Sequence, residues 1–166
     1  MYKTFRISLW KDIKDNEMFK EVVKNNKDRV NDYFTVMIFS KYEEMYKKVD
    51  EIENNTEGDF KKGIEHDYQG RTLVCRKQLF EDDKEEIWGY SKAQGFIFLC
   101  DEEGLTFNTV SHEVGHAVIG YMGAYFKDKF KIKTYEDEKE EEDTLYEELF
   151  CYITGSLNNQ ICVEVE

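Results

Sequence analysis

The chain has 166 residues, of which 36 are acidic and 23 are basic, so its formal net charge is −13. This charge argues against a nucleic-acid or acidic-membrane binder, because contacts to phosphate groups require clustered Lys and Arg. The length suits one domain spanning residues 1–166, and aromatic residues, at 15% of the chain, supply much of its core.

The first part of the chain alternates expected strands and helices. Residues 4–10 alternate apolar and polar side chains, which predicts a half-buried strand. Residues 15–30 carry apolar side chains among charges, which indicates a short amphipathic helix. Residues 33–39 are almost all β-branched or aromatic, which predicts a central strand covered on both faces. Residues 41–52 have helical apolar spacing and are expected to pack on the sheet.

The middle of the chain is expected to add a loop and two strands. Residues 54–63 are polar and contain glycine, which favours a loop. Strands are expected at 71–79 and 95–100, joined by the charged residues 80–90 as a surface connection, with a flap as the alternative. His66 lies before the third strand, and isolated histidines of this kind are mostly polar surface rather than metal ligands.

The last part of the chain is expected to be helical. A helix is predicted over residues 106–123, with Thr106 as its N-cap. The basic residues 127–133 and the acidic residues 136–143 follow, and the acidic run is interpreted as a solvated face. A final helix is predicted over residues 143–161, because Leu and Ile recur there at four-residue spacing.

Four further features of the sequence indicate the compartment and the source of the protein. No apolar run of about 18 residues is present, so no transmembrane helix is expected. The first residues lack the apolar core of a signal peptide. The four cysteines show no C-x-x-C spacing and are interpreted as reduced thiols of a cytoplasmic protein. The absence of proline and the wealth of Lys, Glu, Asn, Ile and Tyr suggest the AT-rich genome of a bacterium or phage.

The strongest chemical signal is the H-E-x-x-H sequence from His112 to His116. Residues four apart on an α-helix lie about 40° apart around its axis, so both imidazoles can reach one metal ion. Glu113 follows the first histidine, where a carboxylate can take a proton from water held by the metal. The opposite face of this helix is an apolar stripe: Val110, Val114, Val118, Tyr121 and Tyr125. The pattern predicts a zinc site.

This motif and its flanks resemble the active-site helix of the zincin metallopeptidases, particularly the gluzincins, over about residues 95–160. Metzincins match poorly, because their longer motif needs Gly and His where this chain has Ile119 and Met122. The resemblance implies a minimal zincin-like α+β fold. In it, a mixed sheet of about four strands, within residues 1–100, packs on the H-E-x-x-H helix and a C-terminal ligand-bearing helix, within residues 105–161.

The gluzincin resemblance implies a third ligand from a glutamate on the final helix, which offers Glu147 and Glu148. Glu148 is preferred, because it shares a stripe with the small residues Cys151 and Gly155 and because Glu148-Leu-Phe-Cys151 is similar to the E-x-x-A pattern of small intracellular and phage zincin-like proteins. Thermolysin-like enzymes have an Asp four residues after the ligand, where this chain has Tyr152.

These residues imply zinc-dependent hydrolysis of a peptide bond. One Zn²⁺ per chain would be held by His112, His116 and Glu148, with Glu113 as the general base. The expected partner is a protein or peptide substrate, and neither nucleic acid nor membrane; the oligomeric state does not follow from the sequence. The alternative is an acidic binding or inhibitor protein that imitates nucleic acid and carries a structural or vestigial metal site, which the charge of −13 supports.

Overall fold

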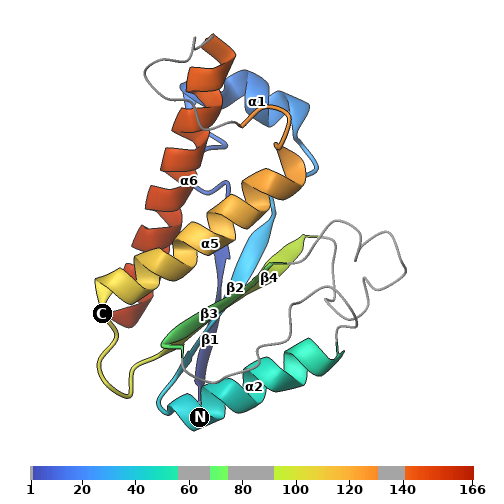
Figure 1. Cartoon of the computed structure of the whole chain (residues 1–166). Helices are drawn as coiled ribbons and strands as arrows, with labels where there is room; N and C mark the ends of the chain where they lie inside the picture. The colour runs from blue at the N-terminus through green and yellow to red at the C-terminus, as the bar shows by residue number, and fades with distance from the viewer. Residues whose placement is uncertain (1, 56–67, 75–91, 131–140) are drawn as a thin grey trace, which may run out of the picture.

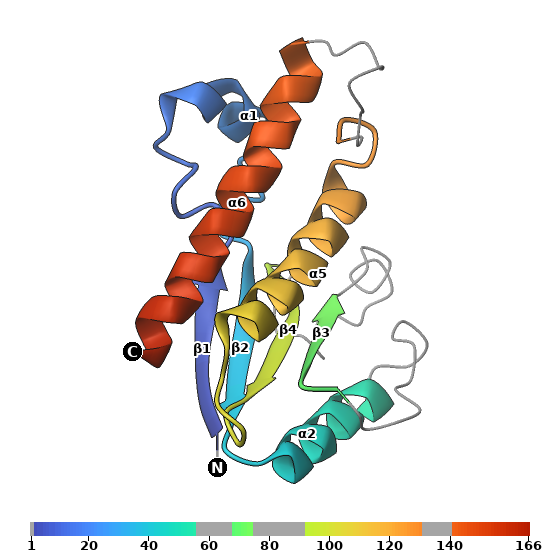
Figure 2. The same ribbon diagram turned by 60° about the vertical axis from the view of Figure 1, so that its left-hand side comes forward.

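The computed structural model describes residues 2–55, 68–74, 92–130 and 141–166. It has an α+β architecture in which α5 and α6 cover one face of a four-stranded mixed sheet and α2 covers the other (Figures 1 and 2). The elements in chain order are β1 (Tyr2–Ser8), η1 (Glu17–Phe19), α1 (Lys20–Asn25), β2 (Tyr33–Phe39), α2 (Tyr42–Asn55), β3 (Gly70–Val74), β4 (Ala93–Cys100), α5 (Phe107–Tyr125) and α6 (Glu141–Val165). No helix in the described ranges is long and apolar enough to cross a membrane.

The strands follow the order β1-β2-β4-β3. β2 pairs antiparallel with β1 and parallel with β4, whereas β3 pairs antiparallel with β4. The prediction of a central strand at 33–39 is confirmed, because β2 has a neighbour on each side and apolar cores against both faces. Among the described strands β3 therefore lies at an edge, in register with β4 from Gly70 opposite Leu99 to Val74 opposite Gly95.

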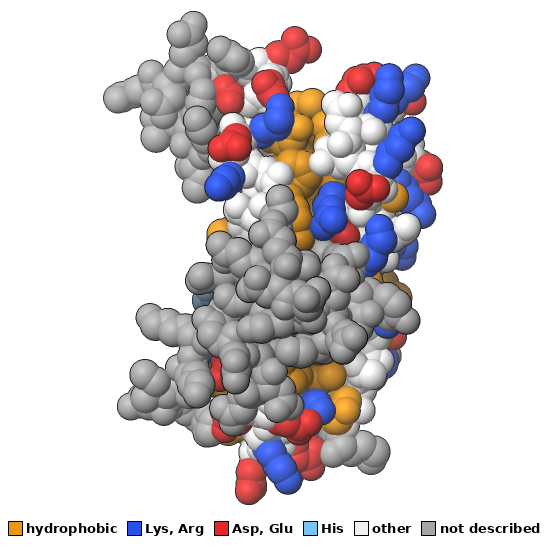
Figure 3. All heavy atoms as spheres, turned by 90° about the vertical axis from the view of Figure 1, so that its right-hand side faces the viewer, with side chains coloured by type: hydrophobic (Ala, Val, Ile, Leu, Met, Phe, Trp, Pro, Cys, Tyr) orange, Lys and Arg blue, Asp and Glu red, His pale blue; other side chains and the backbone are white. Residues whose placement is uncertain are grey.

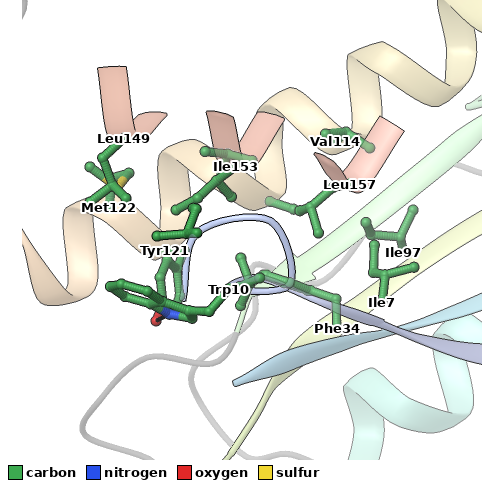
Figure 4. Packing of buried hydrophobic residues seen from close by; sticks show 14 of the residues in the cluster. Ile7, Trp10, Phe34, Ile97, Val114, Tyr121, Met122, Leu149, Ile153 and Leu157 are labelled. Atoms are coloured by element: carbon green, nitrogen blue, oxygen red, sulfur yellow. Dashed lines mark hydrogen bonds between the residues drawn. The ribbon is translucent and has the colours of Figure 1, made fainter. Parts of the chain in front are cut away.

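The period of two along each strand divides the buried side chains between two cores. On β2, Phe34 and Val36 face the core under α5 and α6, while Met37 and Phe39 face α2. The larger core joins the sheet to both long helices (Figure 4). Its labelled members are Ile7, Trp10, Phe34, Ile97, Val114, Tyr121, Met122, Leu149, Ile153 and Leu157.

The two long helices confirm the predictions made from apolar spacing. Thr106 caps α5 by accepting a hydrogen bond from the backbone N–H of Thr109 at 3.2 Å, and α5 runs two residues beyond the expected end at Gly123. The predicted apolar stripe of α5 is buried except for Tyr125, which is partly buried. α6 extends past both predicted ends and buries Leu149, Ile153 and Leu157.

The N-terminal helix is shorter than expected. Only a 3-10 turn and the six-residue α1 form within residues 15–30, although Phe19 and Val22 are buried as the pattern required. β1 starts two residues earlier than predicted and ends at Ser8, yet Leu9 and Trp10 beyond it are fully buried. Tertiary packing thus fixes this segment more than local periodicity does.

Several predictions fall wholly or partly outside the described residues. These are the loop at 54–63, His66, the end of the third strand at 75–79, the connection at 80–90, and the parts of the basic and acidic runs within 131–140. The third strand is confirmed over Gly70–Val74, and the fourth over Ala93–Cys100.

A buried polar network links the N-terminal segment to α5. Tyr121 donates a hydrogen bond to Asp32 Oδ2 at 2.7 Å and accepts one from Trp10 Nε1 at 2.8 Å. Arg29 Nη1 lies 3.5 Å from the same Asp32 oxygen. All three members of the hydrogen-bonded chain are fully buried, so the network fixes where the C-terminal half of α5 sits on the core.

Replacing Asp32 with Asn should change how stability depends on pH. Burial raises the pKa of Asp32 from 3.8 to about 6, against the hydrogen bond from Tyr121 and the charges of Arg29 and Lys92. A carboxyl whose pKa is higher in the folded state stabilises the protein fully below its unfolded pKa, and this contribution is lost as the pH rises through the folded pKa.

A pKa difference of about two corresponds to roughly 3 kcal/mol. From about pH 4 to about pH 7, the parent should therefore lose up to about 3 kcal/mol of unfolding free energy relative to Asp32→Asn. Urea titrations of both proteins at the two pH values measure this difference. A difference that does not change with pH would show that Asp32 does not titrate in this window.

Candidate metal centre

The centre lies on α5, where two exposed histidines stand beside a glutamate that faces β3. His112 and His116, one helical turn apart, are both exposed, and their Nε2 atoms lie 3.2 Å apart. Their rings meet edge to face with centroids 4.8 Å apart. Glu113 Oε1 lies 4.0 Å from His112 Nε2. The spacing of the motif thus brings three potential ligand groups together, all within 4.8 Å of one another.

The histidine pair fits a tetrahedral metal ion. With Zn–N bonds of about 2.0–2.1 Å, two nitrogen ligands of a tetrahedral zinc lie about 3.3 Å apart. The observed 3.2 Å between the two Nε2 atoms matches this separation. Two neutral imidazoles can also share one hydrogen bond at this distance, and a bound metal would take the place of that proton. The donor set of two imidazoles and a nearby carboxylate is one that Zn²⁺ accepts.

Glu113 differs from the histidines because it is buried, with only 4% of its surface exposed. Thr72 Oγ1, on β3, lies 3.0 Å from Glu113 Oε2 and 3.0 Å from the Glu113 backbone oxygen. Burial raises the pKa of Glu113, while the Thr72 hydrogen bond and the charges of His116, His112 and Arg71 oppose that rise. The carboxylate is therefore held between α5 and the edge strand rather than projecting freely beside the histidines.

β3 can approach α5 this closely because each element has a glycine opposite a side chain of the other: Gly70 faces Glu113, and Gly120 faces Val74. A Cβ on Gly70 would lie 2.9 Å from Glu113 Cγ and 3.2 Å from the Phe98 backbone oxygen. A Cβ on Gly120 would lie 2.7 Å from a methyl carbon of Val74. Side chains alternate along β3, so Leu73 faces α2 while residues 70, 72 and 74 face α5. This face of β3 therefore meets α5 along the whole strand.

The structure does not bring Glu148 into the group formed by His112, Glu113 and His116. Glu148 and Glu147 both lie on α6 and are both exposed. Tyr152, at the position where thermolysin-like enzymes have an Asp, packs edge to face on Phe19 with ring centroids 5.3 Å apart. The assignment of Glu148 as third ligand stays a prediction.

Sequence reasoning did not single out Thr72 or Gly70, although both touch Glu113. A threonine in a predicted strand carries no signal of its own, because its partner Glu113 is 41 residues away and meets it only when α5 packs on β3. The glycine before that strand was the one available hint, since glycine at a strand end often marks a close approach of another element.

Comparisons of the chain with protein-family models, curated proteins and solved structures gave no match.

Proposed function

We propose that this protein is a zinc-dependent peptidase. The observation that carries the proposal is the placement of two imidazole nitrogens 3.2 Å apart, with a buried glutamate oxygen 4.0 Å from one of them. A purely structural zinc site is closed by four protein ligands, whereas a catalytic site has three and stays open. The exposed histidine pair, with 68% of the His112 side chain accessible, suits an open site.

His112 and His116 would hold the zinc ion, with Glu148 as the third ligand suggested by the resemblance to gluzincins. When bound, zinc supplies a Lewis acid that polarises a carbonyl group and makes water a nucleophile near neutral pH. Glu113 would accept a proton at Oε1, the oxygen on the side of His112, and deliver it to the leaving amine. The other carboxylate oxygen, Oε2, accepts the hydrogen bond from Thr72.

Peptides are favoured as substrates by the position of β3. This strand lies at an edge of the described sheet, and its Thr72 touches the candidate base. An extended peptide can pair with the backbone groups of such an edge. This pairing would place the peptide bond to be cleaved next to the histidine pair. In the zincins, which this chain resembles, an edge strand serves that purpose.

The proposal is tested on the purified chain, first stripped of metal with a chelator and then offered one equivalent of Zn²⁺. Cleavage of a mixed peptide library, followed by mass spectrometry, should appear with zinc and disappear again on adding excess chelator. Zinc bound without cleavage of any peptide or denatured protein would refute the peptidase proposal. The stripped protein offered Mg²⁺ in place of Zn²⁺ is the metal control, and it should cleave nothing.

The alternative of an acidic binding protein gains no specific support from the face drawn in Figure 3. There Lys and Arg side chains lie among Asp and Glu. Several of the acidic groups in the described residues are paired: Glu164 with Lys3, Glu102 with Lys41, and Glu142 with Lys129. A mimic of nucleic acid needs unpaired negative charges gathered on one surface.

A further inference from the structure

Glu113 has one described side-chain hydrogen-bond donor, the hydroxyl of Thr72 on the facing strand. The Thr72 oxygen lies 3.0 Å from Glu113 Oε2 and 3.0 Å from the Glu113 backbone oxygen. A hydroxyl group has one proton and can donate it to one of these oxygens at a time. The bond to the carboxylate is the stronger of the two, because a charged acceptor roughly doubles the strength of a hydrogen bond.

We propose that Thr72 is a positioning residue that holds Oε2 of Glu113 on β3 and so directs Oε1 toward the histidine pair. Without this bond, the carboxylate could rotate about χ3, the terminal torsion of glutamate, whose preferred values span a broad range. The distances agree with these two roles: Oε2 lies 3.0 Å from the Thr72 hydroxyl, and Oε1 lies 4.0 Å from His112 Nε2.

The packing around the carboxylate supports this role. Gly70, two residues before Thr72 on the same face of β3, leaves room for the Glu113 stem, since a Cβ there would lie 2.9 Å from Cγ and 3.3 Å from Cδ. Gly70 therefore sets how near the Glu113 stem comes to β3. Thr72 sets which carboxylate oxygen faces β3 and which faces the histidine pair. A side chain held by contacts from two residues of a strand is restrained in both position and rotation.

This inference rests on the proposed function for its catalytic readout. Thr72→Val keeps the branched shape and removes the hydroxyl. It should lower kcat roughly ten- to a hundredfold while KM and zinc content stay within about twofold of the parent. Thr72→Ser, which restores a hydroxyl, should recover most of the loss. Thr4→Val is the matched control, because Thr4 on β1 also donates its hydroxyl to a backbone oxygen, that of Val36 at 3.3 Å.

A second measurement needs neither zinc nor activity. In the metal-free protein, the denaturation midpoint is compared for the parent, Thr72→Val, Glu113→Met and the double variant. Glu113→Met removes the carboxylate and leaves the backbone oxygen, so the cycle isolates the side-chain bond. The shift caused by Thr72→Val should be clearly smaller in the Glu113→Met background, whereas the shift caused by Thr4→Val should be the same in both.

Equal shifts of Thr72→Val in the two backgrounds would overturn the proposal, because Thr72 would then be bonded to the backbone alone. A Thr72→Val variant with the parent's kcat would overturn it as well. Coupling in the metal-free protein together with a parent that cleaves nothing would instead refute the peptidase proposal, and would support the hold of Thr72 on Glu113.

Discussion

Replacing Glu113 with Gln should leave zinc bound and abolish nearly all hydrolysis. Glutamine has the same shape as glutamate, so it fills the buried space beside β3 and its amide oxygen can still accept the hydrogen bond from Thr72. It cannot accept a proton at neutral pH. The loss of general acid–base catalysis alone costs about 10²–10⁴-fold in rate. Peptide cleavage and zinc content, measured on the same preparation, test both halves of this prediction.

Glu147→Gln on α6 removes the same charge from an exposed position and serves as the control, with the parent's activity expected. Hydrolysis by Glu113→Gln at the parent's rate would show that Glu113 is not the base. Loss of zinc from Glu113→Gln would show that the carboxylate is a ligand rather than the base, since its oxygen lies within 4.8 Å of both histidine nitrogens. The two failures are distinguishable, because the first leaves the metal content intact.

The candidate site was predictable from sequence where it depends on one helix. Residues four apart must lie on one side of an α-helix, so the meeting of His112 and His116 followed from their spacing alone. The apolar stripe of α5 gave the buried side by the same geometry, and the two histidines are exposed as that pattern requires.

The surroundings of Glu113 were not predictable in this way. Its burial depends on β3 packing across α5, which in turn depends on β3 pairing with β4 and on the absence of side chains at Gly70 and Gly120. These are contacts between segments far apart in the chain, and no local period encodes them. The buried network from Trp10 through Tyr121 to Asp32 was missed for the same reason.

His112→Ala and His116→Ala should each lower zinc affinity by more than about a hundredfold. Loss of a partner that merely orients a ligand costs about 10- to 100-fold in metal affinity, so loss of a ligand itself should cost more. The 3.2 Å between the two Nε2 atoms is what makes both histidines ligands of one ion in the proposal. Competition titration against a chromophoric chelator measures the affinities. Parent-like zinc binding by either variant would remove that histidine from the site.

The same titration applied to α6 tests the third ligand. The resemblance to gluzincins predicts that Glu148→Ala lowers zinc affinity sharply, and that Glu147→Ala, its neighbour on the same exposed helix surface, leaves it unchanged. The described position of Glu148, outside the group of three, means that its carboxylate would have to move toward the histidine pair on metal binding. A sharp loss for Glu148→Ala alone would therefore establish both the ligand and this movement. Parent-like affinity in both variants would show that α6 supplies no ligand, and that the pair on α5 binds zinc with a third ligand from elsewhere.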